Sequence, residues 1–594
     1  MNILGLQLIG HDTGAALIAG LKVVAIAEER LNRFKHSSAF PGLSIDYCLN
    51  SLGLKPADID LIVVSQVGLP GMVDMKKIFL EWPKAQEFRK IRLESIRHYD
   101  AHAASTFLCS PFEEAAILIY DGVGQGYINQ FGATAYETEA LYRGRENKLY
   151  EIQTMTHLRR GRDSIYSFGI GKLYQKLSAV YLGFGANNEG KMMGLAAYGD
   201  DSLLKRYPLE RWVKIFLGQP ICNANLFFAK TQSVKAAPNL SAKIQRLLKK
   251  VFYLRSWLRW KILSLTRRQN NFKFFEPIKL KRPARTIETL PDPYYSAVAY
   301  AAQKILEFVA NFLGDRLKAI TGSHNLCVAG GCGLNIDANR NFIDRVGFKN
   351  LFVQPAASDV GIALGCALYG KHIIFDQPRD WEMKSASLGR NYSETEIKDA
   401  LSKFAKQISH RKANLPEIAK LLTAGKIIGW FQGGSEYGPR ALGHRSILAD
   451  PRRKEMKDVL NNRVKHREPW RPFAASILLN EAVHWFELDL PSPFMLLHAP
   501  ARKDKKDLIP AVLHIDNTAR LQTVSTVNGC YYELISEFYR LTKVPLLLNT
   551  SFNLAGEPIV ETPLDAINTF LATEIDFLVV EGNLIEKLPR DDRR

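Results

Sequence analysis

Two histidines, His98 and His102, are spaced four residues apart in the N-terminal part of the chain. On a helix, side chains at positions i and i+4 share a face, so both imidazoles can bind one metal ion. Two surface histidines would show the same spacing, but Asp121 and Asp359 each follow an apolar run and lie near a glycine. Two histidines with two carboxylates suit Fe(II), Mn(II) or Zn(II). Tyr99 stands where a metalloprotease motif has glutamate, so that pattern is absent.

Several glycine-rich loops lie in the same part of the chain, at residues 10–14, 121–126, 169–171, 190–199 and 330–333. Backbone N–H groups in such loops can bind phosphates, although a plain turn explains each loop taken singly. None of the loops matches the P-loop pattern or the Rossmann fingerprint. Glu189 and Lys191 add an acid and a cation that the ribose and phosphates of a nucleotide could use.

A second group of chemical residues surrounds a glycine loop at 433–443 in the C-terminal part of the chain. Its cations are Arg440, Lys465, Arg467, Arg471 and Arg520. Together they would bind a phosphate-rich substrate through bidentate contacts, whereas each alone is more often a solvated surface charge. Residues 549–553 follow an apolar run and carry amides and hydroxyls that can read adenine or a carbamoyl group.

The net charge of +19 is concentrated in one segment. Residues 241–285 hold 14 lysines and arginines against the single acid Glu276. Such a segment could bind nucleic acid, an anionic membrane or an acidic substrate. Residues 251–265 mix Trp, Leu, Arg and Lys as an interfacial helix does, and a solvated helical hairpin is the alternative.

The cysteines and the apolar runs limit the class of protein. Seven cysteines are scattered without a C-x-x-C pair, which predicts buried thiols in a reduced, cytoplasmic protein. The best membrane-span candidate, 251–266, is interrupted by three cations, so a transmembrane helix is not expected. The first ten residues have no positively charged start and are interpreted as a strand rather than a secretory signal.

The chain of 594 residues predicts two or three domains. Acidic residues at the carboxyl ends of its strands would be well placed for a metal or phosphate. No internal repeat stands out, and the basic, aromatic residues 205–285 are interpreted as an insertion. Strands are predicted at 3–8, 15–18, 21–27, 61–65, 115–120, 325–329, 351–353, 427–431 and 544–548, and helices at 103–108, 295–320 and 360–369.

The sequence resembles the O-carbamoyltransferase family that includes the nodulation-factor and nebramycin carbamoyltransferases. The resemblance runs nearly end to end and is weakest over 205–285, because several relatives lack so large and basic an insertion. It is carried by residues 11–16, 28–30, 35–36, 98–105, 110–116, 189–199, 329–331, 335, 354–365, 433–453, 470–473 and 549–561.

The resemblance implies an α/β protein in two parts. Residues 1–375 would be an actin-like ATPase domain of the TsaD type, 376–387 a linker and 388–594 a YrdC-like α/β domain. The YrdC-like domain would make carbamoyl-adenylate from carbamoyl phosphate and ATP. The TsaD-like domain would hold the adenylate beside an iron ion and pass the carbamoyl group to a hydroxyl.

Motif position also implies roles for single residues. The metal ligands would be His98, His102, Asp121 and Asp359. Near the reacting carbamoyl group would lie His11, Asp12 and Lys35, with His11 the candidate base. Nucleotide contacts would come from Glu189, Lys191, Gly330, Gly331 and Asn335. The adenylation site would hold Arg440, Lys465, Arg471, Arg520 and Asn549.

The predicted function is therefore ATP-dependent O-carbamoyl transfer to a small-molecule hydroxyl, on a sugar, polyketide or aminoglycoside. Its metal would be Fe(II) or another divalent transition metal, with ATP as a substrate and Mg²⁺ beside it. A transferase that adds threonylcarbamoyl to tRNA is the first alternative, and a non-catalytic nucleic-acid-binding protein is the second. We expect no obligatory nucleic acid; the basic insertion could contact an anionic partner, and the oligomeric state stays open, a dimer included.

Overall fold

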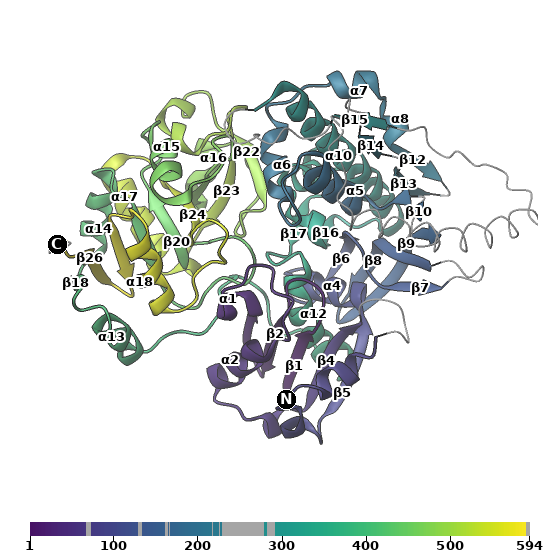
Figure 1. Cartoon of the computed structure of the whole chain (residues 1–594), viewed down its shortest axis with the longest axis horizontal. Helices are drawn as coiled ribbons and strands as arrows, with labels where there is room; N and C mark the ends of the chain where they lie inside the picture. Colours follow the sequence, from purple (N-terminus) through teal and green to yellow (C-terminus); the bar gives the residue numbers. More distant parts are fainter. Residues whose placement is uncertain are drawn as a thin grey trace, which may run out of the picture.

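The computed structural model describes residues 1–66, 73–128, 134–160, 164–165, 167–216, 218–224, 226–228, 278–281 and 291–589. Most of the basic segment 241–285, including the predicted interfacial helix at 251–265, lies outside these described residues. The N-terminal region (residues 1–375) and the C-terminal region (388–589) lie side by side in Figure 1. No described helix is long and apolar enough to cross a membrane. The predicted domain boundaries stay a prediction.

The first sheet of the N-terminal region has the strand order β3-β2-β1-β4-β5. The first three strands are antiparallel neighbours, whereas β1, β4 and β5 run parallel. Alternate residues of β1 enter two different cores, Ile3 on one face and Leu4 and Leu6 on the other, so both faces are covered. The strands are β1 (Asn2–Gln7), β2 (Gly14–Ala19), β3 (Lys22–Ala27), β4 (Leu61–Gln66) and β5 (Arg92–Arg97).

The second sheet repeats this order with different residues. Its main path is β10-β9-β8-β6-β16-β17, in which β9, β8 and β6 are antiparallel neighbours and β6, β16 and β17 run parallel. The N-terminal region is thus a duplicated α/β unit, the actin-like ATPase fold, although the sequence shows no repeat. The strands are β6 (Glu114–Tyr120), β7 (Gly126–Ile128), β8 (Thr134–Arg145), β9 (Lys148–Arg160), β10 (Ser164–Ile165), β16 (Asn325–Ala329) and β17 (Asn350–Val353).

Helices α4 (His98–Phe107) and α12 (Ile362–Tyr369) pack together between the two sheets. Helix α4 begins directly after β5 and therefore starts five residues before the predicted helix at 103–108. The contact with α12 is close because Gly365 faces the backbone of α4: a Cβ added there would lie 1.9 Å from the carbonyl oxygen of Ala101. The glycine therefore fixes the position of the helix that carries both histidines.

Replacing Gly365 by alanine should destabilise the protein by about 2 to 3 kcal/mol, because the added methyl group must force α12 away from α4. The matched control is Gly190→Ala on α6 (Glu189–Ala196), where an added Cβ meets nothing within 4 Å. The control should keep or slightly raise stability, since alanine favours helix more than glycine does. Urea denaturation of both variants measures the difference, and equal midpoints would contradict this account of the packing.

The other helices of the N-terminal region cover the two sheets. The longest, α10 (Pro293–Thr321), starts where the Asp292 carboxylate accepts hydrogen bonds from two backbone N–H groups, and it ends at Gly322 with φ 66°. The remaining helices are α1 (Glu28–Asn32), α2 (Gly42–Leu52), α3 (Met75–Leu80), α5 (Ile170–Lys176), α7 (Ser202–Arg206), α8 (Leu209–Trp212) and α11 (Ile336–Asp344).

The described ends of the predicted insertion at 205–285 belong to the packed N-terminal region. Trp212, Cys222, Ile278 and Leu280 are all fully buried in its core. Their burial shows that both described ends of the segment pack in this core, and the bounds of the insertion stay a prediction. The strands here are β11 (Ser167–Phe168), β12 (Val213–Phe216), β13 (Gln219–Asn223), β14 (Leu226–Phe228) and β15 (Ile278–Leu280).

The C-terminal region is built on a mixed nine-stranded sheet of order β18-β26-β25-β19-β20-β24-β21-β23-β22. The strands predicted at 427–431 and 544–548 are confirmed as β19 and β24. The strands are β18 (Ile408–Lys412), β19 (Ile428–Phe431), β20 (Arg445–Ala449), β21 (Ala474–Leu478), β22 (Leu497–Pro500), β23 (Thr518–Val524), β24 (Leu546–Ser551), β25 (Phe577–Val580) and β26 (Asn583–Lys587). The helices are α13 (Glu394–Ser402), α14 (Leu415–Thr423), α15 (Met456–Leu460), α16 (Ala482–Trp485), α17 (Cys530–Thr542) and α18 (Pro563–Ala572).

Two arginines at α1 hold the two regions together. Arg30 is buried and donates hydrogen bonds to the carbonyl oxygens of Glu436 (3.2 Å) and Gly438 (2.7 Å). Arg33 donates to the carbonyl oxygens of Pro558 (2.9 Å) and Ile559 (2.8 Å). Because buried carbonyl groups need such partners, the two regions are joined by a specific polar contact in addition to apolar packing.

Candidate functional site

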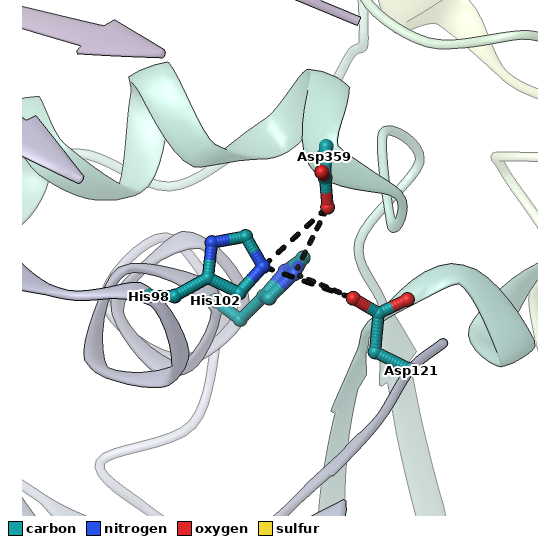
Figure 2. Close-up of side chains that lie close together, drawn as sticks. All are labelled: His98, His102, Asp121 and Asp359. Atoms are coloured by element: carbon teal, nitrogen blue, oxygen red, sulfur yellow. Dashed lines mark ion pairs between the residues drawn. The ribbon is translucent and has the colours of Figure 1, made fainter. Parts of the chain in front are cut away.

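The four residues proposed as metal ligands come together between the two sheets (Figure 2). His98 and His102 point from one face of α4 toward Asp121, which follows β6, and Asp359, which precedes α12. The Nε2 atoms of the two histidines lie 3.5 and 3.7 Å from Asp359 Oδ1 and 3.7 and 3.6 Å from Asp121 Oδ2. All four ligand atoms lie within 4.8 Å of one another.

These separations fit ligands of a shared ion better than direct hydrogen bonds. A tetrahedron of ligands about 2.1 Å from a metal has edges of about 3.4 Å, whereas N–H···O hydrogen bonds are about 2.9 Å long. Both Nε2 atoms are buried and have no hydrogen-bond partner among the described residues. Ser65 Oγ lies 3.2 Å from His98 Nδ1, and the Gly331 N–H donates to Asp121 Oδ1 at 2.9 Å. These neighbours orient two of the four side chains.

The charges in this metal-type cluster also favour a cation. Burial disfavours the imidazolium form of His98, but Asp359 and Asp121 outweigh it and raise the pKa of His98 to about 10. Burial likewise opposes ionisation of Asp121 and Asp359, but the two histidines outweigh it and hold both carboxyl pKa values below normal. Two buried carboxylates therefore demand a positive charge between them, which a bound divalent ion would supply.

His11 and Asp12 border this cluster, and a third residue, His36, joins them. Asp12 Oδ2 lies 3.1 Å from His11 Nδ1, and Asp12 Oδ1 lies 2.8 Å from His36 Nδ1. Asp12 and His36 both have positive φ angles, 62° and 55°. Such a backbone is strained for residues other than glycine, and the sequence pattern does not reveal it. The hydrogen bond to Asp12 and then the charge of Asp359 raise the pKa of His11 to about 9, with burial opposing them. His11 Nε2 lies 4.0 Å from Asp359 Oδ2, so it faces the cluster.

The glycines and the asparagine predicted for the nucleotide have different surroundings. Gly330 has φ 89°, and a Cβ there would lie 2.4 Å from the carbonyl oxygen of Tyr120, so only glycine fits. Gly331 supports Asp121, as described above. The Asn335 side chain accepts a hydrogen bond from the Ala338 N–H and exchanges two with Gln303. Its amide is therefore already committed within the fold, and a direct contact with nucleotide stays a prediction.

The cations predicted for the adenylation site form a cluster in the C-terminal region, and the charges around them are mainly those of other cations. Burial and the charge of Arg471 lower the pKa of Arg440 to about 10 and that of Arg467 to about 9. Burial and the charges of Arg440, Arg467 and Arg471 lower the pKa of Arg520. The Nε atoms of Arg440 and Arg520 are buried without a hydrogen-bond partner among the described residues. Uncompensated cations of this kind are typical of a site that binds an anion.

Two residues of this cluster, Lys465 and Asn549, are held by hydrogen bonds within the C-terminal region. Lys465 is buried and donates to the Ser551 carbonyl oxygen (2.7 Å) and to Asn553 Oδ1 (2.8 Å), which fixes its ammonium group beside the 549–553 segment. Asn549 is fully buried and donates to Ser476 Oγ (2.9 Å) and to the Ala441 carbonyl oxygen (3.2 Å). Asn549 thus positions the loop after Arg440, and direct substrate contact by it stays a prediction.

The cations of both regions meet at one boundary. Lys191 Nζ on α6 lies 2.7 Å from Glu468 Oε1, which comes from the C-terminal region. Lys35 is exposed, yet the surrounding protein desolvates its ammonium group and lowers its pKa, and the like charges of Arg471 and Lys191 lower it further. Glu468 received no role from the sequence. The sequence did contain a signal for it, because Glu468 is a single acid between the cations Arg467 and Arg471.

Comparison with known proteins agrees with this two-part organisation. The family described as Carbamoyltransferase N-terminus matches residues 2–85, 70–207 and 220–368, and Carbamoyltransferase C-terminus matches residues 419–587. Nodulation protein NolNO of Sinorhizobium fredii is 34% identical over 97% of this chain and 79% of its own length. An uncharacterized Synechocystis protein is 32% identical over 100% of this chain and 98% of its own length.

Solved structures add little to these matches. Full-length HypF in its phosphate- and nucleotide-bound form shares 13% identity, covers 63% of this chain and 55% of its own, and has a TM-score of 0.30. So low a score carries no argument, and the fold rests on the repeated strand order described above. The two family matches and the curated relatives decide the assignment: the chain belongs to the carbamoyltransferase family and is a carbamoyltransferase.

Proposed function

We propose that this carbamoyltransferase works in two steps at two sites. The C-terminal cluster would form carbamoyl-adenylate from ATP and carbamoyl phosphate, and the N-terminal cluster would transfer the carbamoyl group to a hydroxyl of a small molecule. The observation that carries this proposal is a run of charges across the two regions: Arg440 and Arg520 form no ion pair among the described residues, Arg471 acts on both as a like charge, and Arg471 also acts on Lys35 of the other region. Substrates with several phosphates match such a row of cations.

In the C-terminal cluster, Arg440, Arg471 and Arg520 would bind carbamoyl phosphate and the ATP phosphates. Lys465, held by Ser551 and Asn553, would place its charge on the transferred carbamoyl oxygen or on phosphate. Because these cations are held in position by the fold before substrate arrives, little reorganisation would be needed when charge develops. Water would first cleave carbamoyl phosphate into carbamate and phosphate. An oxygen of the carbamate would then attack the α-phosphorus of ATP and displace pyrophosphate, and the adenylate so formed would stay shielded from water between the regions.

In the N-terminal cluster, His98, His102, Asp121 and Asp359 would hold a divalent transition metal, for which Fe(II) is the predicted identity. Such an ion would polarise the carbamoyl carbonyl as a Lewis acid. Lys35 would bind the adenylate phosphate. His11, oriented by Asp12, would take the proton of the acceptor hydroxyl in its unprotonated form, whose share grows as the pH rises toward its pKa of about 9. Glu189 and Lys191 at α6 would contact the nucleotide. The acceptor would be a hydroxyl-bearing sugar or secondary metabolite.

The first test is pyrophosphate release from ATP by the metal-replete protein. We expect carbamoyl phosphate to stimulate the release at least about tenfold, because the carbamate formed from it is the nucleophile that displaces pyrophosphate. A mass-spectrometric screen of hydroxyl compounds would then identify the acceptor by its added carbamoyl group. No stimulation by carbamoyl phosphate would reject the adenylate route, and stimulation that depends on threonine would favour the tRNA-modifying alternative.

A further inference from the structure

The boundary between the two regions contains an acid that neither half-reaction uses. Glu468 is mostly buried, with 17% of its side chain exposed, and its two carboxylate oxygens face cations from both regions. Oε1 lies 2.7 Å from Lys191 Nζ of the N-terminal region, and Oε2 lies 3.6 Å from Arg471 Nη1 of its own region. A carboxylate between two cations has the charge and the acceptor oxygens of a phosphate group.

The residues around Glu468 are fixed firmly enough to form a defined site. The ring of Trp470 is buried in the core of the N-terminal region and lies 6.4 Å from the ring of Phe184. A Cβ added to Gly194 on α6 would lie 3.5 Å from Pro472 Cδ, so the segment 470–472 packs directly on that helix. Helix α6 lies at the boundary with the C-terminal region (Figure 1). This packing fixes the backbone that follows Glu468, so its own side chain is the part that can move.

The cations of this boundary exceed the charge that Glu468 provides. Lys35 forms no ion pair among the described residues; the carboxylates of Glu29 and Asp12 act on it as opposite charges, and Arg471 and Lys191 act on it as like charges. Lys465 and Arg467 also lie near Arg471. Five cations therefore face three carboxylates here, and an anion with more charge and more oxygens than Glu468 would be bound more strongly.

We infer that Lys35, Lys191 and Arg471 form a phosphate-binding site between the two regions, and that the Glu468 carboxylate occupies it until a phosphate displaces it. The ligand class is a phosphate monoester or adenylate. In terms of the proposed function, on which this extension rests, the ligand is the adenylate on its way from the C-terminal cluster to the N-terminal one. When no adenylate is present, Glu468 then joins Lys191 and Arg471 across the boundary between the two regions.

The test is calorimetric titration of the full-length protein with inorganic phosphate and separately with AMP, neither of which requires turnover. Glu468→Gln removes the internal anion but keeps the size of the side chain, so both ligands should bind about tenfold more tightly than to the wild type. The matched control is Glu417→Gln, which breaks an exposed ion pair with Arg411 in the same region and should leave both affinities unchanged. A gain for AMP alone would assign the site to a nucleotide phosphate, and a gain for both to phosphate in general.

A second variant separates this inference from a merely structural role. In the double variant Lys191→Gln/Glu468→Gln the gain in phosphate affinity should disappear, because the cation that Glu468→Gln sets free, Lys191, is no longer there. If Glu468 were only a strut between the regions, Glu468→Gln would loosen Lys191 and Arg471 and weaken phosphate binding. Unchanged or weaker binding in Glu468→Gln would overturn the inference, even if pyrophosphate release proved the two-step reaction. Tighter binding without any carbamoyl-phosphate-stimulated release would keep the phosphate site and reject the proposed function.

Discussion

Replacing both His98 and His102 by alanine should remove the bound metal and lower carbamoyl transfer at least about 1000-fold, while adenylate formation continues. The metal-type cluster would lose both imidazole ligands, and two carboxylates alone hold a transition metal weakly. A Lewis acid contributes several kcal/mol to polarising a carbonyl, which corresponds to three or more powers of ten in rate. The cations around Arg440 are untouched, so carbamoyl-phosphate-dependent exchange of pyrophosphate into ATP should stay near the wild-type rate.

Three measurements on the same preparation decide this prediction: metal content by elemental analysis, pyrophosphate exchange, and carbamoylated product. The control replaces His410 and His484, both exposed in the C-terminal region, and should change none of the three. If exchange and transfer fell together, the two-site division would be wrong. If metal stayed bound with both histidines absent, the cluster in Figure 2 would not be its site.

Apolar runs were enough to predict nine of the 26 described strands, because a strand covered on both faces is a continuous run of buried residues. They could not reveal the duplication of the N-terminal region. Strand β1 reads NILGLQ and β6 reads EAAILIY, which occupy equivalent places in the two sheets without a shared motif. Burial selects apolar residues at such positions but does not select particular ones, so topology can repeat where sequence does not.

The metal-type cluster was predictable because spacing carries it. The i, i+4 relation holds for any helix, and the sequence placed both aspartates after strands whose carboxyl ends meet. The start of α4 was not predictable, because His98-Tyr99-Asp100 has weak helix propensity and becomes helical through packing on α12 and β16.

The hydrogen-bond partners of buried side chains were the other feature that the sequence could not predict. The contacts of Asn335 and Asn549 with substrate stay a prediction, but the structure adds hydrogen bonds that the sequence does not reveal, from Asn335 to Gln303 and from Asn549 to Ser476. A single sequence does not show which polar partner a buried amide finds, because these partners are 32 and 73 residues away. The same reason explains why His36 and Glu468 gained their roles only when distant segments met.

Replacing Arg520 by methionine should stabilise the protein while disabling adenylate formation. Its guanidinium lies on β23, where burial and the charges of Arg440, Arg467 and Arg471 lower its pKa, and it forms no ion pair among the described residues. Methionine keeps much of the side-chain volume and removes the repulsion, so the free energy of unfolding should rise by about 1 to 2 kcal/mol. Active sites commonly hold charges at such a cost to stability.

The same change should lower kcat/KM for carbamoyl phosphate in pyrophosphate exchange by about 100- to 1000-fold, since a buried charged contact to an anion contributes about 3 to 4 kcal/mol. Arg411→Met is the matched control: it removes an exposed arginine paired with Glu417 and should leave both stability and exchange nearly unchanged. Urea denaturation and exchange kinetics on the two variants measure both quantities. Loss of stability together with loss of exchange would mean that Arg520 supports the fold. A gain in stability together with a loss of exchange can arise only if the charge of Arg520 is held there for a ligand that the folded chain itself does not provide.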